Sequence, residues 1–450
     1  MIVLVAAGLP LLMVPAALAL RRVSAAAAAL ATLVALVVAG ALAASQAQAA
    51  PLVILGRSIG LTPLTGGAFA FSCALLAMVV LHTVAVPVDH TAYALMLVAM
   101  ALFGGTLAIR NPAIGGMLLE IGAIVATLLM VLRRGDLAME GMRSLVVVGL
   151  LLPLILMASG VLGTRTSIVV GESPPSGLLA LAGMLVVALG LVPFHVWLMP
   201  VYRRGPGLSI VMLTVVMGIV VLAFAASALG WPELPQRIGV FSTVLLVAGL
   251  ASAILGGLGA LGQRTFGRVL AFGALADMGV VLVGLGLGGP TDMAAALLHA
   301  VYRGLGVTAA AIALDVFRER LGGDDEHHLR GALRKAPLTV LGMSLAAFSL
   351  SGLPLMAGFG TRLLIYTSLA QENPTWAVLA VVASVGPLWA FGRAMRAAFA
   401  PLRYQGEERE PRISGGLVLF VGLLLLMWGV FPQAVPFAPV EWLSAHLGGM

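Results

Sequence analysis

Long apolar segments follow one another along almost the whole of this sequence. About fourteen of them have the length of roughly 20 residues that a helix needs to cross the hydrocarbon core of a bilayer. Their approximate limits are 1–20, 24–46, 66–88, 91–110, 113–132, 142–162, 177–200, 206–229, 238–261, 268–288, 291–317, 337–370, 375–400 and 413–433. Backbone groups inside a bilayer have no water to bond, so such segments must be helical. The sequence therefore predicts an all-α polytopic membrane protein with about fourteen transmembrane helices.

Two of these segments, the seventh and the twelfth, are predicted to be broken. The seventh contains Pro193, and the twelfth, which is too long for one straight span, contains Gly352 and Pro354. Proline removes a backbone donor and clashes with the preceding turn. In a bilayer such a break is tolerated where the freed backbone is buried in protein or lines a water-filled cavity. Because His195 and Arg362 follow the two breaks, we expect both breaks to lie on an ion or substrate path.

The composition excludes several classes of protein. The chain of 450 residues is 61% hydrophobic and only 10% charged, which leaves no room for a sizeable soluble domain. Its single cysteine, Cys73, lies in an apolar segment, so disulfides and cysteine-bound iron–sulfur centres within the chain are excluded. No Walker A, CxxC, HExxH or GxSxG motif has a credible context. We therefore expect no cofactor, no metal site and no nucleic-acid partner.

The basic residues alternate between the two sides of the predicted membrane. Loops after odd-numbered segments hold 19 lysines and arginines, whereas loops after even-numbered segments hold only 4. The positive-inside rule then predicts that the odd-numbered loops are cytoplasmic and that both termini lie outside, in a cell (inner) membrane protein. Residues 1–20 have no basic region before them, so we expect a first transmembrane helix rather than a cleaved signal peptide.

The spacing of the two breaks predicts an internal repeat. They fall five segments apart, which favours two five-helix repeats, and an odd number of helices makes the repeats inverted. The predicted division is residues 1–90 for helices 1–3, 91–229 for the first repeat, 238–400 for the second repeat, and 401–450 for helix 14 and the tail.

Two ionisable residues occur within the first predicted repeat. Glu120 lies in the middle of an apolar segment, where it is either a protonated or capped structural carboxyl or a protonatable site on a proton path. His195 follows the break at Pro193 and either caps freed carbonyls or takes part in a proton relay, since histidine titrates near neutral pH.

The second predicted repeat holds four more ionisable residues. Asp277 lies midway along its segment, and His299 and Arg303 are four residues apart and share one face of the next helix. A buried ion pair between Asp277 and Arg303 is the structural interpretation. Arg362 either lies in the middle of the membrane or extends its charged end outward along its stem. Because arginine does not deprotonate, it is expected to tune its neighbours and order water rather than to carry a proton.

Charged residues near the loops are expected to be solvated. Asp315, Arg318 and Glu319 end the eleventh segment, and His327 and His328 follow an acidic run. A metal site at the two histidines is the alternative, but such charge runs are usually solvated loops.

Several of these motifs together resemble the proton-conducting antiporter-like membrane subunits. That family includes large membrane subunits of complex I (respiratory NADH dehydrogenase), hydrogenase-4-type energy-converting hydrogenases and multi-subunit Na⁺/H⁺ antiporters. The motifs, in the family's order over roughly residues 90–400, are Leu191–Trp197 for the seventh helix, Arg268–Phe272 and Asp277–Gly279 for the tenth, His299–Arg303 for the eleventh, and Gly331–Pro337, Ser351–Pro354 and Gly358–Phe359 for the loop and broken twelfth helix.

The resemblance implies roles for individual residues. Glu120 matches the family's fifth-helix glutamate and His195 the histidine after the seventh-helix proline. Arg303 stands at the eleventh-helix lysine, and Arg362 at the twelfth-helix lysine or glutamate. Asp277 stands where many relatives carry histidine.

The sequence departs from the family in its first half. The positions of the seventh- and eighth-helix lysines fall near Ala188 and Met217, so the first half-channel lacks its usual cations. Lysine can be tuned toward neutral pH by burial whereas arginine cannot. Pumping is therefore expected to be altered or impaired.

These observations predict an antiporter-like membrane subunit of a redox-linked, proton-translocating complex of the NADH dehydrogenase or energy-converting hydrogenase type. Other membrane subunits and the lipid bilayer would be its partners, and a quinone-reducing or hydrogenase module would be reached through them. One alternative is a structural membrane-arm subunit that does not pump. Another is a component of a multi-subunit cation/proton antiporter or of an inorganic-carbon uptake complex. In each case the chain would be at most a non-catalytic subunit.

Overall fold

The computed structural model describes residues 2–45, 51–54, 56–89, 91–131, 136–162, 175–228, 239–401 and 410–435. The chain divides into two compact units, Met1–Gly190 with Leu208–Trp231, and Leu191–Gly207 with Pro232–Met450. The division into four segments that the sequence predicts stays a prediction.

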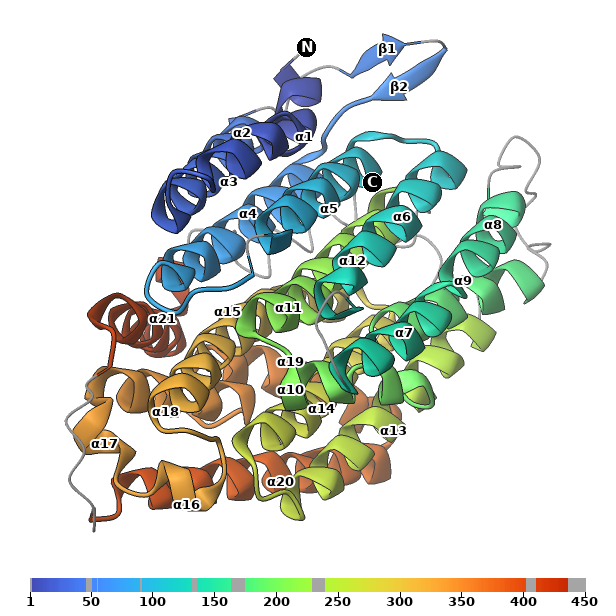
Figure 1. Ribbon diagram of the computed structural model, residues 1–450. Helices are drawn as coiled ribbons and strands as arrows, with labels where there is room; N and C mark the ends of the chain where they lie inside the picture. The colour runs from blue at the N-terminus through green and yellow to red at the C-terminus, as the bar shows by residue number, and fades with distance from the viewer. Residues whose placement is uncertain are drawn as a thin grey trace. The chain divides into compact units, whose positions relative to one another are not determined.

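The first unit consists of helices and one small hairpin (Figure 1). Its elements are α1 (Ile2–Leu12), α2 (Val14–Leu20), α3 (Ala25–Ser45), β1 (Leu52–Ile54), β2 (Arg57–Ile59), α4 (Pro63–Thr83), α5 (Thr91–Ala108), α6 (Pro112–Val131), α7 (Asp136–Val148), α8 (Leu151–Leu162), α9 (Pro175–Ala188), the π-helical turn η2 (Val211–Val216) and α12 (Met217–Ala228), with α11 (Gly207–Ile210) leading into it.

Helices, joined by short loops, are the named elements of the second unit in its described residues (Figure 1). Its elements are η1 (Phe194–Trp197), α10 (Met199–Arg204), α13 (Gly239–Leu261), α14 (Phe266–Leu287), α15 (Pro290–Arg320), α16 (Glu326–Leu329), α17 (Ala332–Lys335), α18 (Pro337–Leu350), α19 (Ala357–Glu372), α20 (Pro374–Phe399), α21 (Arg412–Val430) and η4 (Pro432–Ala434).

The prediction of a multi-pass helical membrane protein is confirmed. In the described part of the chain, twelve helices are long and apolar enough to cross a membrane. Two further apolar helices, Ser176–Ala188 and Pro337–Leu350, are shorter because they end at the predicted breaks. The total of fourteen spans and the inverted repeats stay predictions.

Both predicted breaks are present, and their causes are local. After α9 the chain leaves the helix through Gly190, whose φ is 61°, and resumes as η1 beyond Pro193. After α18 it turns through Gly352, whose φ is 72°, and resumes as α19 at Ala357. Glycine is the residue that adopts such positive φ angles without steric cost.

A hairpin and an interruption of the sixth apolar segment are among the irregularities of the described residues that the sequence analysis does not predict. The hairpin pairs Leu52 with Ile59 and Ile54 with Arg57, and Gly56 occupies its turn with a φ of 71°. The sixth apolar segment is interrupted between α7 and α8, because Pro153 in the first turn of α8 has no N–H to continue the helical ladder.

Glycines let the central helices of the second unit touch through their backbones. A Cβ placed on Gly249 of α13 would lie 2.8 Å from the carbonyl oxygen of Gly279 of α14. One placed on Gly256 would lie 2.6 Å from the carbonyl oxygen of Phe272. Small residues permit this approach between membrane helices. The contact fixes α14, which carries Asp277, against α13.

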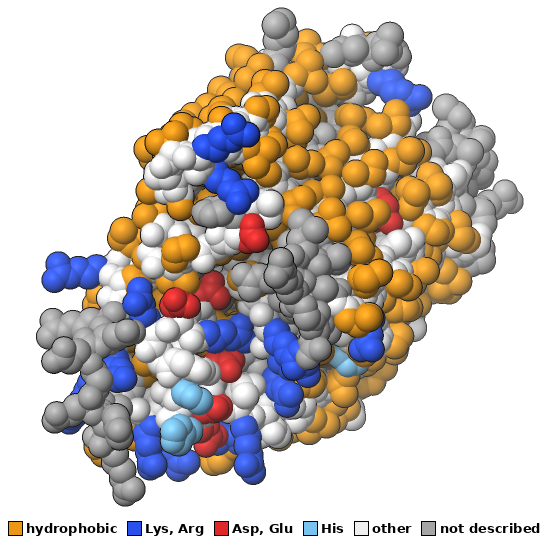
Figure 2. Space-filling view, in the orientation of Figure 1, with side chains coloured by type: hydrophobic (Ala, Val, Ile, Leu, Met, Phe, Trp, Pro, Cys, Tyr) orange, Lys and Arg blue, Asp and Glu red, His pale blue; other side chains and the backbone are white. Residues whose placement is uncertain are grey.

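The surface in Figure 2 is apolar over most of its area. Charged and histidine side chains gather on it around α16 and α17, in the second unit. This distribution is typical of helices that meet lipid along their length and water at one end.

Candidate functional site

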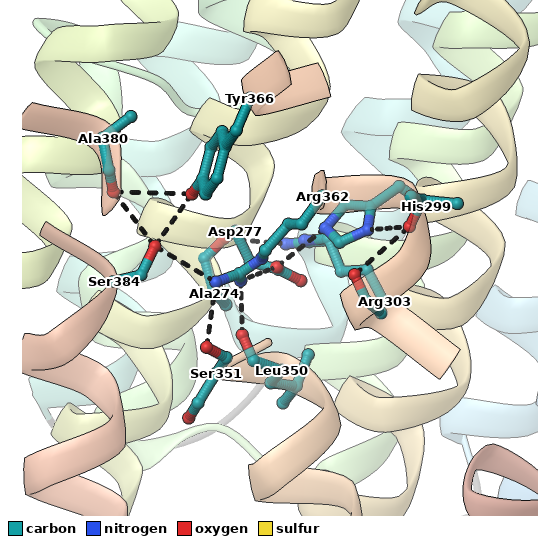
Figure 3. A network of polar contacts seen from close by, with 12 residues as sticks. Ala274, Asp277, His299, Arg303, Leu350, Ser351, Arg362, Tyr366, Ala380 and Ser384 are labelled. Carbon is teal, nitrogen blue, oxygen red and sulfur yellow. Dashed lines mark hydrogen bonds and ion pairs between the residues drawn. The ribbon is translucent and has the colours of Figure 1, made fainter. Parts of the chain in front are cut away.

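A buried carboxylate lies at the centre of the second unit. Asp277 on α14 has an exposed fraction of 1%. Its Oδ1 atom lies 2.9 Å from Nε2 of His299 on α15 and also accepts a hydrogen bond and ion pair from Nη2 of Arg362 on α19. Three helices therefore meet at one carboxylate oxygen (Figure 3).

Arg362 also caps the end of α18 at the break in the twelfth segment. Its Nη2 donates to the carbonyl of Leu350 at 2.6 Å, and its Nη1 donates to the carbonyl of Ser351 at 3.0 Å. These are carbonyls that the end of α18 leaves without helical partners. Arg362 is only 4% exposed, so its guanidinium is enclosed by the helices of the second unit.

A short polar chain continues from Arg362 to α20. Nη1 of Arg362 donates to Oγ of Ser384 at 3.3 Å, and that oxygen lies 2.8 Å from the hydroxyl of Tyr366. Ser384 and Tyr366 are half-buried. Figure 3 shows these groups on one side of the guanidinium and His299 on the other.

His299 is held through both ring nitrogens. Nε2 faces Asp277, and Nδ1 lies 2.8 Å from Oγ1 of Thr361 in the first turns of α19. The ring and the threonine have exposed fractions of 1% and 4%. The break before α19 is what brings Thr361 and Arg362 to the cluster together.

Arg303 lies one helical turn from His299 on α15 and is 5% exposed. Its Nη2 contacts the carbonyl of Ala274 at 3.5 Å, one turn before Asp277 on α14. Under the structural interpretation given in the sequence analysis, Asp277 would form an ion pair with Arg303. The ion pair that forms at Oδ1 of Asp277 is with Arg362.

The cluster contains two groups that can exchange a proton. Guanidinium groups stay charged, so Arg303 and Arg362 supply fixed positive charge, while Asp277 and His299 can gain or lose a proton. Within the described residues, Oδ2 of Asp277 has no hydrogen-bond partner, although it is buried. Buried acceptors are normally hydrogen-bonded, so this oxygen is expected to bind a water molecule or a proton.

The broken seventh segment contacts α13 rather than the residues of this cluster. The backbone N–H of Val192 donates to Oγ of Ser252 on α13 at 3.0 Å, which anchors the break. His195 is half-buried, and its Nδ1 has no hydrogen-bond partner in the part of the chain that the structure describes. No hydrogen bond or ion pair among the described residues joins His195 to Asp277.

Glu120 lies in the first unit, on α6, and is 5% exposed. The backbone of Leu152, in the first turn of α8, forms a hydrogen bond with its carboxyl. The N-terminus of a helix favours a carboxylate, because its first N–H groups are unpaired. Oε2 of Glu120 has no hydrogen-bond partner among the described residues.

The positions that the resemblance assigns to lysine are apolar and enclosed. Ala188 ends α9 with an exposed fraction of 2%, and Met217 begins α12 with 0%. The π-helical turn η2 comes directly before Met217.

The charged end of α15 is not simply solvated, so that expectation is wrong for two residues. Arg318 donates to the carbonyls of Tyr202, Arg203 and Gly205 at 2.7–3.0 Å. Asp315 accepts from the backbone N–H of Gly207 at 2.8 Å. These bonds tie α15 to the end of α10.

Asp325, His327 and His328 have ligand atoms within 4.8 Å of one another and stand beyond the membrane helices. Asp325 is already engaged, because it caps α16 through two backbone N–H groups and lies 2.9 Å from Nδ1 of His328. Burial raises the pKa of Asp325, but hydrogen bonds from the backbone and ring of His328 outweigh it and leave the pKa below its usual value. These contacts explain the grouping without a metal.

Sequence reasoning misses Thr361, Tyr366 and Ser384. Two of them could be found from the sequence. Thr361 is next to Arg362, and Tyr366 follows Arg362 by four residues on the same helix face. Ser384 comes from another helix and leaves no such signal.

A family model described as NADH:quinone oxidoreductase/Mrp antiporter, TM, matches residues 175–386. The chain is 29% identical over 296 residues to NADH-quinone oxidoreductase subunit N of Desulfovibrio desulfuricans, a match that covers 60% of this chain. The chain spans 57% of the length of that curated relative.

Two solved structures share the fold. A chain of respiratory complex I from Thermus thermophilus is 20% identical, with a TM-score of 0.82 and 99% of each chain covered. A chain of an archaeal membrane-bound sulfane sulfur reductase is 19% identical, with a TM-score of 0.83 and coverage of 99% of this chain and 97% of the other. The resemblance that the motifs predict is thereby confirmed over residues 175–386, which match this family model.

Proposed function

We propose that this chain is an antiporter-like membrane subunit of a redox-linked, proton-translocating complex of the NADH dehydrogenase or energy-converting hydrogenase type. It binds other membrane subunits laterally, in the cell (inner) membrane, with both termini on the non-cytoplasmic side. It holds no redox cofactor, and electrons pass through other subunits of the complex.

One observation carries this proposal: Asp277 and His299, two groups that can exchange protons, are hydrogen-bonded to each other and buried among the helices of the second unit. Ionisable groups at such depth are expensive and mark ion paths. Arg303 and Arg362 supply fixed charge beside them, and the orphaned Oδ2 of Asp277 is a natural position for water. We assign the proton path to the second half, with Glu120 and His195 as secondary candidates.

The test measures formation of a ΔpH by inverted membrane vesicles, driven by the donor that the copurified complex oxidises. Asp277→Asn and His299→Gln are each expected to lower the rate by about tenfold or more, as loss of a proton-transferring group does. Thr308→Val is the matched control, because Thr308 is buried on the same helix as His299. Among the described residues, its hydroxyl bonds only to the Gly304 carbonyl. Unchanged pumping in both site variants would remove the channel assignment.

A structural subunit that does not pump is the second candidate. The apolar, buried Ala188 and Met217 favour it, since the first half lacks the cations that the family resemblance leads one to expect. Complexes that assemble normally with Asp277→Asn and keep full ΔpH formation would support this candidate. A ΔpH that depends on added Na⁺ would instead favour a cation/proton antiporter.

A further inference from the structure

The ionised state of Asp277 dictates where the ring hydrogens of His299 lie. Oδ1 of Asp277 is paired with Arg362, and an ionised carboxylate only accepts hydrogen bonds. Nε2 of His299, at 2.9 Å from that oxygen, must therefore carry hydrogen whether the ring is neutral or charged. Nδ1 is then the ring nitrogen that carries hydrogen in the charged ring and none in the neutral ring.

Nδ1 has a single hydrogen-bond partner among the described residues, Oγ1 of Thr361 at 2.8 Å. That hydroxyl has a second neighbour, the carbonyl oxygen of Gly358 at 3.3 Å. A hydroxyl donates one hydrogen and accepts others, and it rotates to suit its surroundings. Thr361 can therefore face Nδ1 in either sense: as a donor to the bare nitrogen, or as an acceptor from N–H while it donates to Gly358.

The first turn of α19 packs close to the His299 ring at Gly358. Gly358 lies against the ring, since a Cβ built there would be 3.6 Å from Cε1 of His299 and 2.6 Å from the Ser349 carbonyl oxygen. The ring is 1% exposed. A glycine thus lets the first turn of α19 approach the ring at Cε1, the carbon bonded to Nδ1.

We propose that Thr361 is the proton gate of His299. When the ring is neutral, the Thr361 hydroxyl donates to Nδ1. To charge the ring, Thr361 passes its hydrogen to Nδ1 while its oxygen takes a proton from a protonated water on its other side. That water is left neutral, so one proton enters and the hydroxyl is restored. The Thr361 hydroxyl then accepts from the new N–H and turns its hydrogen to the Gly358 carbonyl. This inference rests on the proposed proton path through His299.

The test uses vesicles of the intact complex carrying Thr361→Val, Thr361→Ser or His299→Gln, with Thr308→Val as control. Valine keeps the shape of threonine and removes the hydroxyl, so we expect ΔpH formation to fall by about tenfold or more. Serine restores the hydroxyl, so its rate should stay within about twofold of the unmodified chain, as should that of the control. Should Thr361→Val reduce the amount of assembled complex, Thr361→Ala is compared with Thr308→Ala.

The outcomes separate this inference from the proposed function. If His299→Gln abolishes pumping but Thr361→Val does not, the gate is wrong and the proton path stands. Equal losses in the valine and serine variants would show that the threonine methyl group matters rather than its hydroxyl, which also overturns the gate. If neither His299→Gln nor Thr361→Val affects pumping, the proposed function itself fails.

Discussion

The two halves of this chain differ in how they accommodate buried charge. In the first, Glu120 meets the unpaired backbone at the start of α8, and the positions near Ala188 and Met217 are apolar. In the second, one carboxylate, one histidine and one arginine are bonded together at a helix break. A capped single carboxyl is a stable arrangement, whereas a linked set of titrating groups offers a route for protons. The linked set in the second half is the reason that we propose the proton path there.

The largest loss of stability is expected from removing Arg362 in the second half. Arg362→Met leaves the Asp277 carboxylate buried without its ion-pair partner, which costs about 3–5 kcal/mol of stability. It also frees the carbonyls of Leu350 and Ser351. The free energy of unfolding, from SDS titration in mixed micelles, measures the loss.

The double variant Asp277→Asn with Arg362→Met removes both charges. It should recover a large part of that loss, because no unpaired buried charge remains. A double variant no more stable than Arg362→Met alone would show that Asp277 is not the main partner of the arginine.

A new charge in the first half should lower stability nearly as much. Ala188→Lys places an ammonium at the buried end of α9, and a lysine in a membrane interior costs about 3 kcal/mol. We expect less assembled complex in detergent extracts, with Ala188→Leu as the uncharged control. If the lysine is tolerated and pumping rises, the first half is hydrated and the contrast between the halves is wrong.

The break in the second half should be sensitive to a single methyl group. Gly352→Ala introduces a Cβ at a φ of 72°, which costs roughly 1–2 kcal/mol. That Cβ would also lie 2.7 Å from Cδ of Arg362. The same SDS titration should show the loss, whereas Gly360→Ala should not, because no atom lies within 4 Å of a Cβ there.

The smallest effect, on the rate of ΔpH formation, is expected from replacing the carboxyl of Glu120 in the first half. Glu120→Gln keeps the shape of the side chain and one acceptor for Leu152, so ΔpH formation should change by less than about twofold. The rate is measured beside Asp277→Asn in the same vesicle preparation. A loss with Glu120→Gln as large as that with Asp277→Asn would restore the first half as a conducting path.

Sequence reasoning predicts the apolar helices and both breaks, because span length and proline act locally. It also identifies Asp277, His299 and Arg362, because charge in an apolar segment needs a partner. It does not determine which charge pairs with which. Arg303 shares a helix face with His299, but the ion pair of Asp277 forms with Arg362, which is distant in sequence and placed by the break. The contact of Ser384 with Arg362 likewise depends on how α19 and α20 pack.

The most direct test of the central claim is a high-resolution density map of the copurified complex. We expect ordered water beside Oδ2 of Asp277 and within reach of Thr361, with the Asp277–His299 and Asp277–Arg362 contacts intact. A dry, apolar surround at Asp277, with α18 and α19 continuous through Gly352 and Pro354, would contradict the assignment of a proton path to the second half.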